Sequence, residues 1–456
     1  MSTALSVPKL NLARFLYSMS QVDSFNPVAR RGKVVKVTGS VVQSSGPLAS
    51  IGDLCRIRGR HSEKEILAEV VGFHDQSVLL MPFSDMQGVR PGSVVISEGS
   101  PLQVRTGFDL MGRVLNGLGQ PIDGKGPVCG DGFASLKASP PHPLRRQRIQ
   151  QRFTTGIKVL DTFVPCGVGQ RLGIFAGSGV GKSTLLGMIA GQAEADINVI
   201  ALIGERGREL REFLERDMSP EARKKSVVVV ATSDETPIMR LKGAHTAMAI
   251  SEYFRDQGLN VLLMMDSVTR FAMAQREVGL SVGELPATKG YPPSVFAMLP
   301  QLLERAGAGE NGAITGLFTV LVEGDDMNDP VADHVRSVLD GHIVLSRELA
   351  FRNHYPAVDV LHSVSRLFED LSEGKTQQWI HKAREAMAEF HEHRDIISLG
   401  AYKQGSNPSL DRAIRLRPAL NAFLMQSVHE GFSIDESLTL LKEALEDKEP
   451  VAADKR

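Results

Sequence analysis

The sequence is poor in cysteine and in aromatic residues, and it has no long apolar run. Its three cysteines, Cys55, Cys129 and Cys166, are far apart and lack the spacing of metal ligands. This pattern predicts buried, reduced thiols and argues against disulfides or a zinc site. The longest apolar runs fall far short of the roughly 20 residues that a membrane helix needs. The first thirty residues contain no apolar leader run, so we expect a cytoplasmic protein.

Neither sign of charge dominates the chain. The 52 basic and 53 acidic residues leave a net charge of −1, which excludes a general attraction to nucleic acid or to an anionic membrane. At 456 residues, of which 42% are hydrophobic, the chain is long enough for two or three domains. We therefore expect a multidomain globular protein. Any binding to nucleic acid or to a membrane would have to use a local patch of charge.

An apolar stripe precedes the first compact domain. Apolar residues recur at helical spacing between Leu12 and Met19, which predicts a short amphipathic helix. This pattern fits a helix that docks onto a partner as well as one that folds back on its own protein.

Short β-rich runs follow, from Gly32 to about Ser97, separated by Gly, Pro and Asp. Such spacing is typical of a small barrel or sandwich. A stretch dense in Gly, Pro and basic residues comes next, and it predicts a linker. Beyond Gly156 apolar strands alternate with helical segments, which indicates a mostly parallel sheet covered by helices. From about Leu367 only helical patterns remain, and Ser433 and Glu436 form a predicted capping box.

A glycine-rich loop joins one strand to one helix. The stretch "IFAGSGVGKSTLLG", residues 174–187, fits the phosphate-binding pattern, except that Ala176 stands where the strict pattern has glycine. Its glycines let successive N–H groups turn inward, and the helix adds its positive end. Lys182 is expected to reach the β and γ phosphates, and the Ser183 hydroxyl to bind Mg²⁺. The expected nucleotide-binding residues of this loop are Ala176, Gly177, Ser178, Gly179, Val180, Gly181, Lys182, Ser183 and Thr184.

Two carboxylates follow neighbouring strands. Asp266 ends the run "NVLLMMD", which suits a second ligand on the metal side, although a strand followed by an N-cap gives the same pattern. Glu205 directly follows "INVIALIG", at the edge where Lys182 is expected, and is the candidate for orienting water. The later charges differ from Glu205, because they fit a solvated helix face: Glu209, Arg211, Glu212 and Glu215. The alternative is that Glu205 is only the first of these charges, favourable near a helix start.

Several motifs together carry a resemblance to a known family. "AGSGVGKST", "IGERGRE", "LLMMDSVTRFAMAQRE", "PATKGYPPSVF" and "PAVDVLHSVS" resemble the catalytic subunits of rotary ATPases, over about residues 30 to 370. "RDIISLGAYKQGSNPSLDRAI", 394–414, is similar to the C-terminal region of flagellar, or type III secretion, export ATPases. The resemblance implies an α/β fold with a RecA-like P-loop ATPase core, an N-terminal small β-barrel and a C-terminal helical domain.

The resemblance also implies boundaries and roles. The expected segments are a partner-docking segment 1–28, a barrel 29–100, an ATPase domain with its linker 101–366 and a helical domain 367–456. Glu205 matches the general base, Arg206 a phosphate-side neighbour, and Asp266 the Mg²⁺ carboxylate. Tyr355 matches an aromatic residue that packs on adenine; the alternative is an ordinary core tyrosine, but the chain has only five tyrosines. Arg366 matches an arginine supplied to the adjacent subunit.

The function implied is hydrolysis of Mg-ATP by a homohexameric ring that drives protein export beneath a membrane gate. Expected partners are a stator-like regulator, which binds the N-terminal segment, and chaperone–cargo complexes; no specific nucleic acid is expected. The expected location is the inner face of the bacterial cytoplasmic membrane. Alternatives are an injectisome ATPase, a proton-coupled synthase β-type subunit, a Rho-like RNA motor and a regulator without turnover. The barrel has few aromatic residues for an RNA track. Arginines cluster only in "RRQRIQQRF", in the linker. This cluster suits an exposed contact between domains or subunits as well as it suits RNA binding.

Overall fold

The computed structural model describes residues 30–59, 65–322, 324 and 326–446. The predicted helix between Leu12 and Met19 lies outside these residues. The chain divides after Pro101 into two compact units. In the described ranges no helix is both long and apolar enough to cross a membrane.

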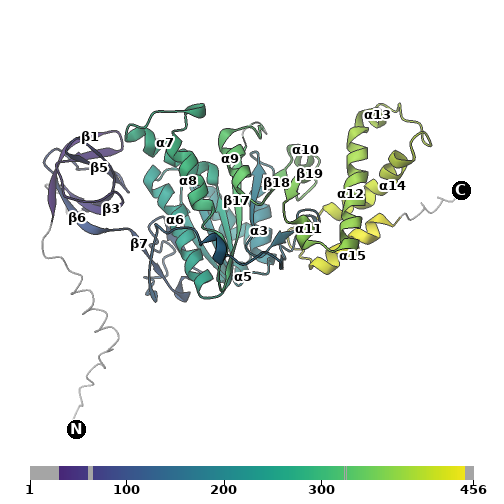
Figure 1. Ribbon diagram of the computed structural model, residues 1–456, viewed down its shortest axis with the longest axis horizontal. Coiled ribbons are helices and arrows are strands. Elements are labelled where there is room, and N and C mark those ends of the chain that lie inside the picture. Colours follow the sequence, from purple (N-terminus) through teal and green to yellow (C-terminus); the bar gives the residue numbers. More distant parts are fainter. Residues whose placement is uncertain (1–29, 60–64, 323, 325, 447–456) are drawn as a thin grey trace, which may run out of the picture. The chain divides into compact units, whose positions relative to one another are not determined.

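The first unit holds a closed antiparallel barrel in the strand order β1-β2-β5-β4-β3-β6 (Figure 1). Alternation of apolar and polar residues builds it: in β1, Val34 is buried and its neighbours are exposed. The core also includes Val42, Ile57, Val70 and Leu80. The strands are β1 (Arg31–Thr38), β2 (Val41–Ser44), β3 (Asp53–Arg58), β4 (Glu65–His74), β5 (Ser77–Pro82) and β6 (Val94–Pro101).

The second unit is built on a nine-stranded sheet in the order β19-β18-β12-β17-β15-β13-β14-β8, with β16 paired to β17. Strands β12 to β15 are fully or nearly fully buried apolar runs, as expected of parallel strands covered on both faces. The strands are β8 (Val114–Asn116), β12 (Arg171–Ala176), β13 (Ile197–Ile203), β14 (Ser226–Ala231), β15 (Asn260–Asp266), β16 (Gly307–Ala308), β17 (Ala313–Leu321), β18 (Gly341–Leu345) and β19 (Val358–Ser365).

Helices cover both faces of this sheet (Figure 1). Helix α6 packs on β13, β14 and β15, and it is followed in that layer by α7, α8 and α9; α3 and α5 lie on the other face. The helices are α2 (Lys158–Phe163), α3 (Lys182–Gln192), α4 (Gly207–Glu212), α5 (Pro220–Lys224), α6 (Pro237–Asp256), α7 (Val268–Ser281), α8 (Pro293–Leu303), α9 (Pro330–Val338) and α10 (Arg347–Phe351).

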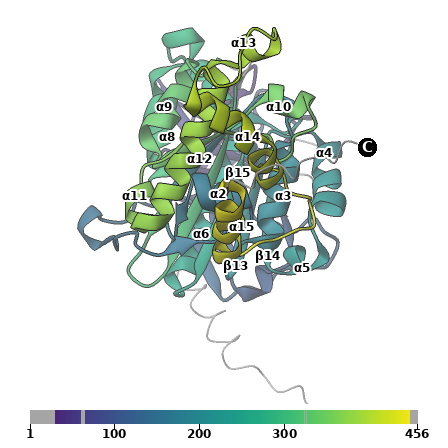
Figure 2. The same ribbon diagram turned by 90° about the vertical axis from the view of Figure 1, so that its right-hand side faces the viewer.

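The C-terminal part is helical, as expected from the sequence. Helices α12, α14 and α15 pack against one another and against α2 (Figure 2). The predicted capping box is confirmed, because Ser433 and Glu436 bond reciprocally at the start of α15. The helices here are α11 (Phe368–Leu371), α12 (Gly374–Glu392), α13 (Arg394–Ser398), α14 (Pro408–Leu424) and α15 (Ile434–Leu445).

Two expectations need correction. Regular structure borders the predicted linker: β7 (Gln103–Thr106) pairs with β9 (Gly132–Ser135), and β8 joins the edge of the main sheet beside β14. These strands are only three or four residues long and lie among Gly and Pro residues. They are too short to give a periodic pattern in the sequence. Cys55 and Cys166 are buried, but Cys129 is exposed, in an irregular stretch of this same region; all three are free thiols.

Candidate active site

The phosphate loop leaves the sheet at the end of β12 and enters α3 at Lys182. Gly179 and Gly181 have φ angles of 79° and 86°, which residues with a Cβ rarely adopt. A Cβ on Gly181 would also lie 3.2 Å from the ring of Tyr355. Glycine is therefore required here both for the backbone turn and for the close approach of the tyrosine.

Three charged side chains converge beside this loop. Lys182 Nζ lies 3.6 Å from Glu205 Oε1 and contacts Asp266 Oδ1 directly. The side chains of Lys182, Glu205 and Asp266 are only 11%, 17% and 5% exposed. Strands β12, β13 and β15 are parallel members of one sheet, so their carboxyl ends bring the three residues to one edge. Two carboxylates thus share one ammonium group in a nearly closed site.

A hydroxyl group not considered from the sequence completes the contacts of Asp266. Thr319, fully buried in β17, donates from Oγ1 to Asp266 Oδ1 at 2.7 Å. The same carboxylate oxygen receives the contact from Lys182. Thr319 lies near the end of the apolar strand β17, and a hydroxyl residue at that place was the only signal in the sequence.

The pKa of Glu205 is raised to about 7. Burial is the largest cause, because it disfavours the charged form; Lys182 acts in the opposite direction, and Asp266 and Glu209 raise the pKa further. A carboxyl with this pKa can hold or release a proton near neutral pH, which suits a general base.

Two buried polar atoms beside the loop have no hydrogen-bond partner among the described residues, namely Glu205 Oε1 and Arg270 Nε. Gly204, whose φ is 73°, lets the stem of Arg270 pass close to the backbone, since a Cβ there would lie 2.7 Å from it. Buried polar groups are normally satisfied. The unpaired donor Arg270 Nε, together with Lys182 and the glycine cradle, therefore fits the phosphates of a nucleotide, whereas Glu205 Oε1, an acceptor 3.6 Å from Lys182 Nζ, fits a water molecule. The oxygens of Asp266 and Ser183 fit Mg²⁺.

Other predicted residues border this site or lie away from it. Tyr355 is 42% exposed beside the loop, and its carbonyl accepts from the backbone of Gln426. Ser183 is exposed in the first turn of α3. The Arg206 side chain is 76% exposed and pairs with Glu209 at 3.3 Å, so the structure does not bring it to the phosphate loop.

Arg366 lies at the opposite edge of the sheet. In the antiparallel pair β18–β19, Leu345 faces Val358 and Gly341 faces Ser365. Ala176 lies beside Leu345, so the phosphate loop leaves the sheet where β19 begins, whereas Arg366 follows the end of β19. Arg366 is exposed, and among the described residues its guanidinium makes one hydrogen bond, a long one of 3.4 Å to the carbonyl of Arg336. Arg366 therefore cannot serve the site of its own chain.

Comparison with known proteins identifies the family. The sequence matches the nucleotide-binding domain of the ATP synthase alpha/beta family over residues 156–365, its beta-barrel domain over 34–99, and the T3SS EscN ATPase C-terminal domain over 373–443. It is 53% identical to the flagellum-specific ATP synthase of Bacillus subtilis, over 90% of this chain and 94% of the relative. The chain belongs to the type III secretion export ATPases of the ATP synthase alpha/beta family.

Other export ATPases are also similar. The type 3 secretion system ATPase of Xanthomonas euvesicatoria is 47% identical, over 92% of this chain and 95% of the relative. Among solved structures, the assembled ATPase EscN of enteropathogenic E. coli is 44% identical, with a TM-score of 0.86, over 91% of this chain and all of that one. EscN in complex with its central stalk EscO has a TM-score of 0.84. The predicted architecture of barrel, ATPase core and helical domain is confirmed.

Proposed function

We propose that this export ATPase hydrolyses Mg-ATP and thereby energises protein export through the flagellar type III apparatus. The observation that carries the proposal is the convergence of Lys182, Glu205 and Asp266 at one sheet edge, in a chain similar over nine-tenths of its length to flagellum-specific relatives. Phosphoryl transfer depends on positioning and on charge stabilisation, and these residues supply both.

Each residue has a part in this mechanism. The backbone of the phosphate loop and Lys182 hold the terminal phosphates, and Tyr355 packs on the base. Ser183 and Asp266 would hold Mg²⁺, which would supply charge neutralisation at the phosphates. Glu205, deprotonated, accepts a proton from the water that attacks the γ phosphorus, while the bond to the β-phosphate oxygen breaks and leaves ADP and phosphate.

Assembly completes the site in this proposal. Arg366 is exposed and distant from the phosphate loop of its own chain, so it serves the site of an adjacent protomer in a homohexameric ring. The N-terminal segment binds a stator-like regulator, and the ring acts on chaperone-bound cargo beneath the export gate, at the inner face of the cytoplasmic membrane.

Replacing Thr319 by valine should weaken the use of Mg²⁺. Valine keeps the shape of threonine but removes the donor to the buried Asp266 carboxylate, a bond to a charged group that contributes about 1.5–3 kcal/mol. We expect the free Mg²⁺ needed for half-maximal hydrolysis to rise about tenfold, and Thr319→Ser to restore it. Thr315→Val is the matched control, because Thr315 is buried in the same strand but its hydroxyl accepts from Gly169. Equal Mg²⁺ dependence in both valine variants would contradict the role of Thr319.

Hydrolysis should also depend on pH through Glu205. Because the pKa of Glu205 is raised to about 7, the base is mostly protonated below that value and mostly active above it. The kcat/KM for ATP, which reports the free enzyme, should rise with pH to half its plateau near 7. The pH dependence of ATP binding to the Glu205→Gln variant is the control, because this variant lacks the Glu205 carboxyl and any remaining pH dependence comes from other groups, such as the nucleotide. A flat kcat/KM profile across neutrality would contradict the assignment.

Deletion of the gene tests the biological role. We expect cells that lack it to have no flagellar filaments by electron microscopy, and the wild-type gene to restore them, whereas the Glu205→Gln gene should not. The 47% identity to a type 3 secretion system ATPase favours an injectisome ATPase as the second candidate. Normal filaments with loss of effector secretion would establish that alternative.

A further inference from the structure

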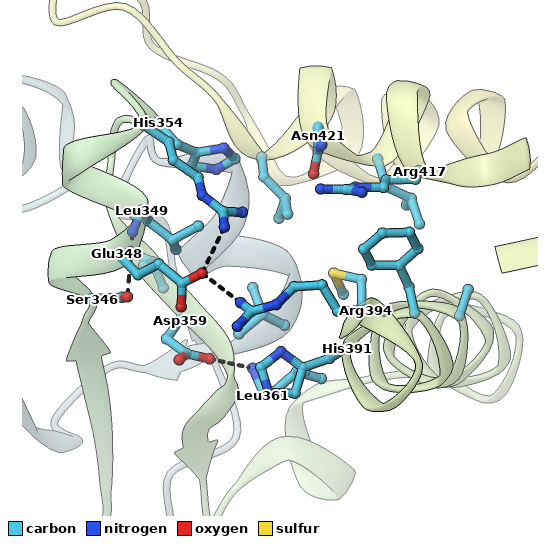
Figure 3. Close-up of a pocket in the computed structure, with 18 of the residues that line it drawn as sticks. Ser346, Glu348, Leu349, His354, Asp359, Leu361, His391, Arg394, Arg417 and Asn421 are labelled. Carbon is cyan, nitrogen blue, oxygen red and sulfur yellow. Dashed lines mark hydrogen bonds and ion pairs between the residues drawn. The ribbon is translucent and has the colours of Figure 1, made fainter. Parts of the chain in front are cut away.

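A cavity of about 370 Å³ lies between the nucleotide-binding sheet and the C-terminal helices, apart from the phosphate loop (Figure 3). Its volume falls within the range of small-molecule sites, roughly 300–1,000 Å³. None of the phosphate-loop residues lines it. One wall comes from α10 and β19, and the other from α12, α13 and α14. The apolar part of the lining is formed by Leu349, Val358, Val360, Leu361, Ala386, Met387, Phe390, Ala413, Leu420, Leu424 and Met425.

Positive charge exceeds negative charge in the lining. Three arginines, Arg352, Arg394 and Arg417, face two carboxylates. Glu348 accepts from both Arg352 and Arg394, so one carboxylate is shared between two guanidinium groups. Asp359, the other carboxylate, is engaged by the backbone N–H groups of Leu361 and His362 and by the His362 ring. The lining therefore has one positive charge that no carboxylate neutralises.

That charge is on Arg417. No carboxylate pairs with it in the part of the chain that the structure describes, and its guanidinium carbon lies 3.7 Å from the centre of the Phe390 ring. Its guanidinium points into the cavity in Figure 3. Burial, and then the charges of Arg352 and Arg394, lower its pKa, but a guanidinium stays protonated at physiological pH. Asn421 is one turn further along the same face of α14 and also lines the cavity.

A buried ring nitrogen is also unpaired here. His354 lines the cavity and is 9% exposed, and its Nε2 has no hydrogen-bond partner among the described residues. Burial lowers the pKa of this imidazole, so the ring is neutral and adds no further charge. A polar side chain buried to this extent without a partner is rare, and a bound polar group would satisfy it.

We propose that this cavity binds a small amphiphilic monoanion, an organic acid whose apolar body packs against the side chains of α12, α14 and β19 and whose anionic group pairs with Arg417. A single unneutralised guanidinium favours one negative charge over the several of a nucleotide or polyphosphate. The hydrophobic walls favour an aliphatic or aromatic body over a small inorganic anion. The proposal does not depend on hydrolysis at the phosphate loop.

A matched pair of fluorescent probes tests the proposal on the full chain. 8-Anilinonaphthalene-1-sulfonate is a monoanion with an aromatic body, and N-phenyl-1-naphthylamine has the same body without the sulfonate. We expect the sulfonate probe to bind the wild-type protein at one site per chain, about tenfold more tightly than the neutral probe. The Arg417→Met variant, which keeps an apolar contact with Phe390, should lose this preference, whereas Arg412→Met, on the exposed face of the same helix, should keep it.

Two results would overturn the proposal. One is equal affinity of the wild-type protein for the two probes, which needs no variant and so does not depend on how a variant folds. The other is unchanged affinity of Arg417→Met for the sulfonate probe.

Discussion

The Glu205→Gln variant should bind ATP but hydrolyse it about 10²- to 10⁴-fold more slowly than the wild-type protein, the range expected for loss of a general base. Glutamine has nearly the same shape as glutamate, so the packing beside Lys182 is retained, but an amide cannot accept the proton of the attacking water. Phosphate release measured at saturating Mg-ATP, together with binding of a fluorescent ATP analogue, checks both parts.

Glu212→Gln is the control for this substitution. Glu212 lies on α4, only a few residues along the chain, with a side chain that is 45% exposed and pairs with Arg208. It should hydrolyse ATP at the wild-type rate. Full hydrolysis by Glu205→Gln would remove the proposed base and favour a nucleotide-binding regulator without turnover.

The Arg366→Ala variant should be nearly as inactive, although Arg366 is far from the phosphate loop of its own chain. An arginine supplied in trans to a phosphoryl-transfer site contributes about 10³- to 10⁵-fold to the rate, and the variant should lose an effect of that order. ATP affinity of the separate protomer should be unchanged, because Arg366 makes no contact with its own site. Arg223→Ala, an exposed arginine on α5, is the control.

The same role makes hydrolysis by the wild-type protein dependent on concentration. A separate protomer lacks the arginine of its neighbour, so turnover per protomer should rise as the ring assembles. Turnover that stays constant on dilution through the range in which the ring dissociates would contradict a role in trans.

Much of the site could be predicted because its chemistry is local in sequence. The phosphate loop needs glycines, a lysine and a hydroxyl residue within one short stretch, and the structure places that stretch between β12 and α3 as expected. Asp266 ends one apolar strand and Glu205 comes two residues after another. Parallel strands end at a common edge, so the convergence of these residues on Lys182 follows from the strand pattern.

The rest depends on contacts between distant residues, which periodicity does not show. Thr319 has the sequence surroundings of a core residue, and only the pairing of strands brings its hydroxyl to Asp266. Strand β8 was hidden in a Gly- and Pro-rich stretch because it is three residues long and is held by its neighbour β14. The cavity around Arg417 joins helices some sixty residues apart along the chain, and no motif marks it.

The central claim is that each active site is shared between two protomers, with Glu205 from one and Arg366 from the next. Mixing the inactive Glu205→Gln and Arg366→Ala proteins before assembly tests it most directly, because some boundaries then combine a native Glu205 with a native Arg366. With random assembly of equal amounts, about a quarter of the boundaries are complete, and we expect hydrolysis to recover toward that fraction of the wild-type rate. No recovery in mixed rings of normal size would contradict the shared site.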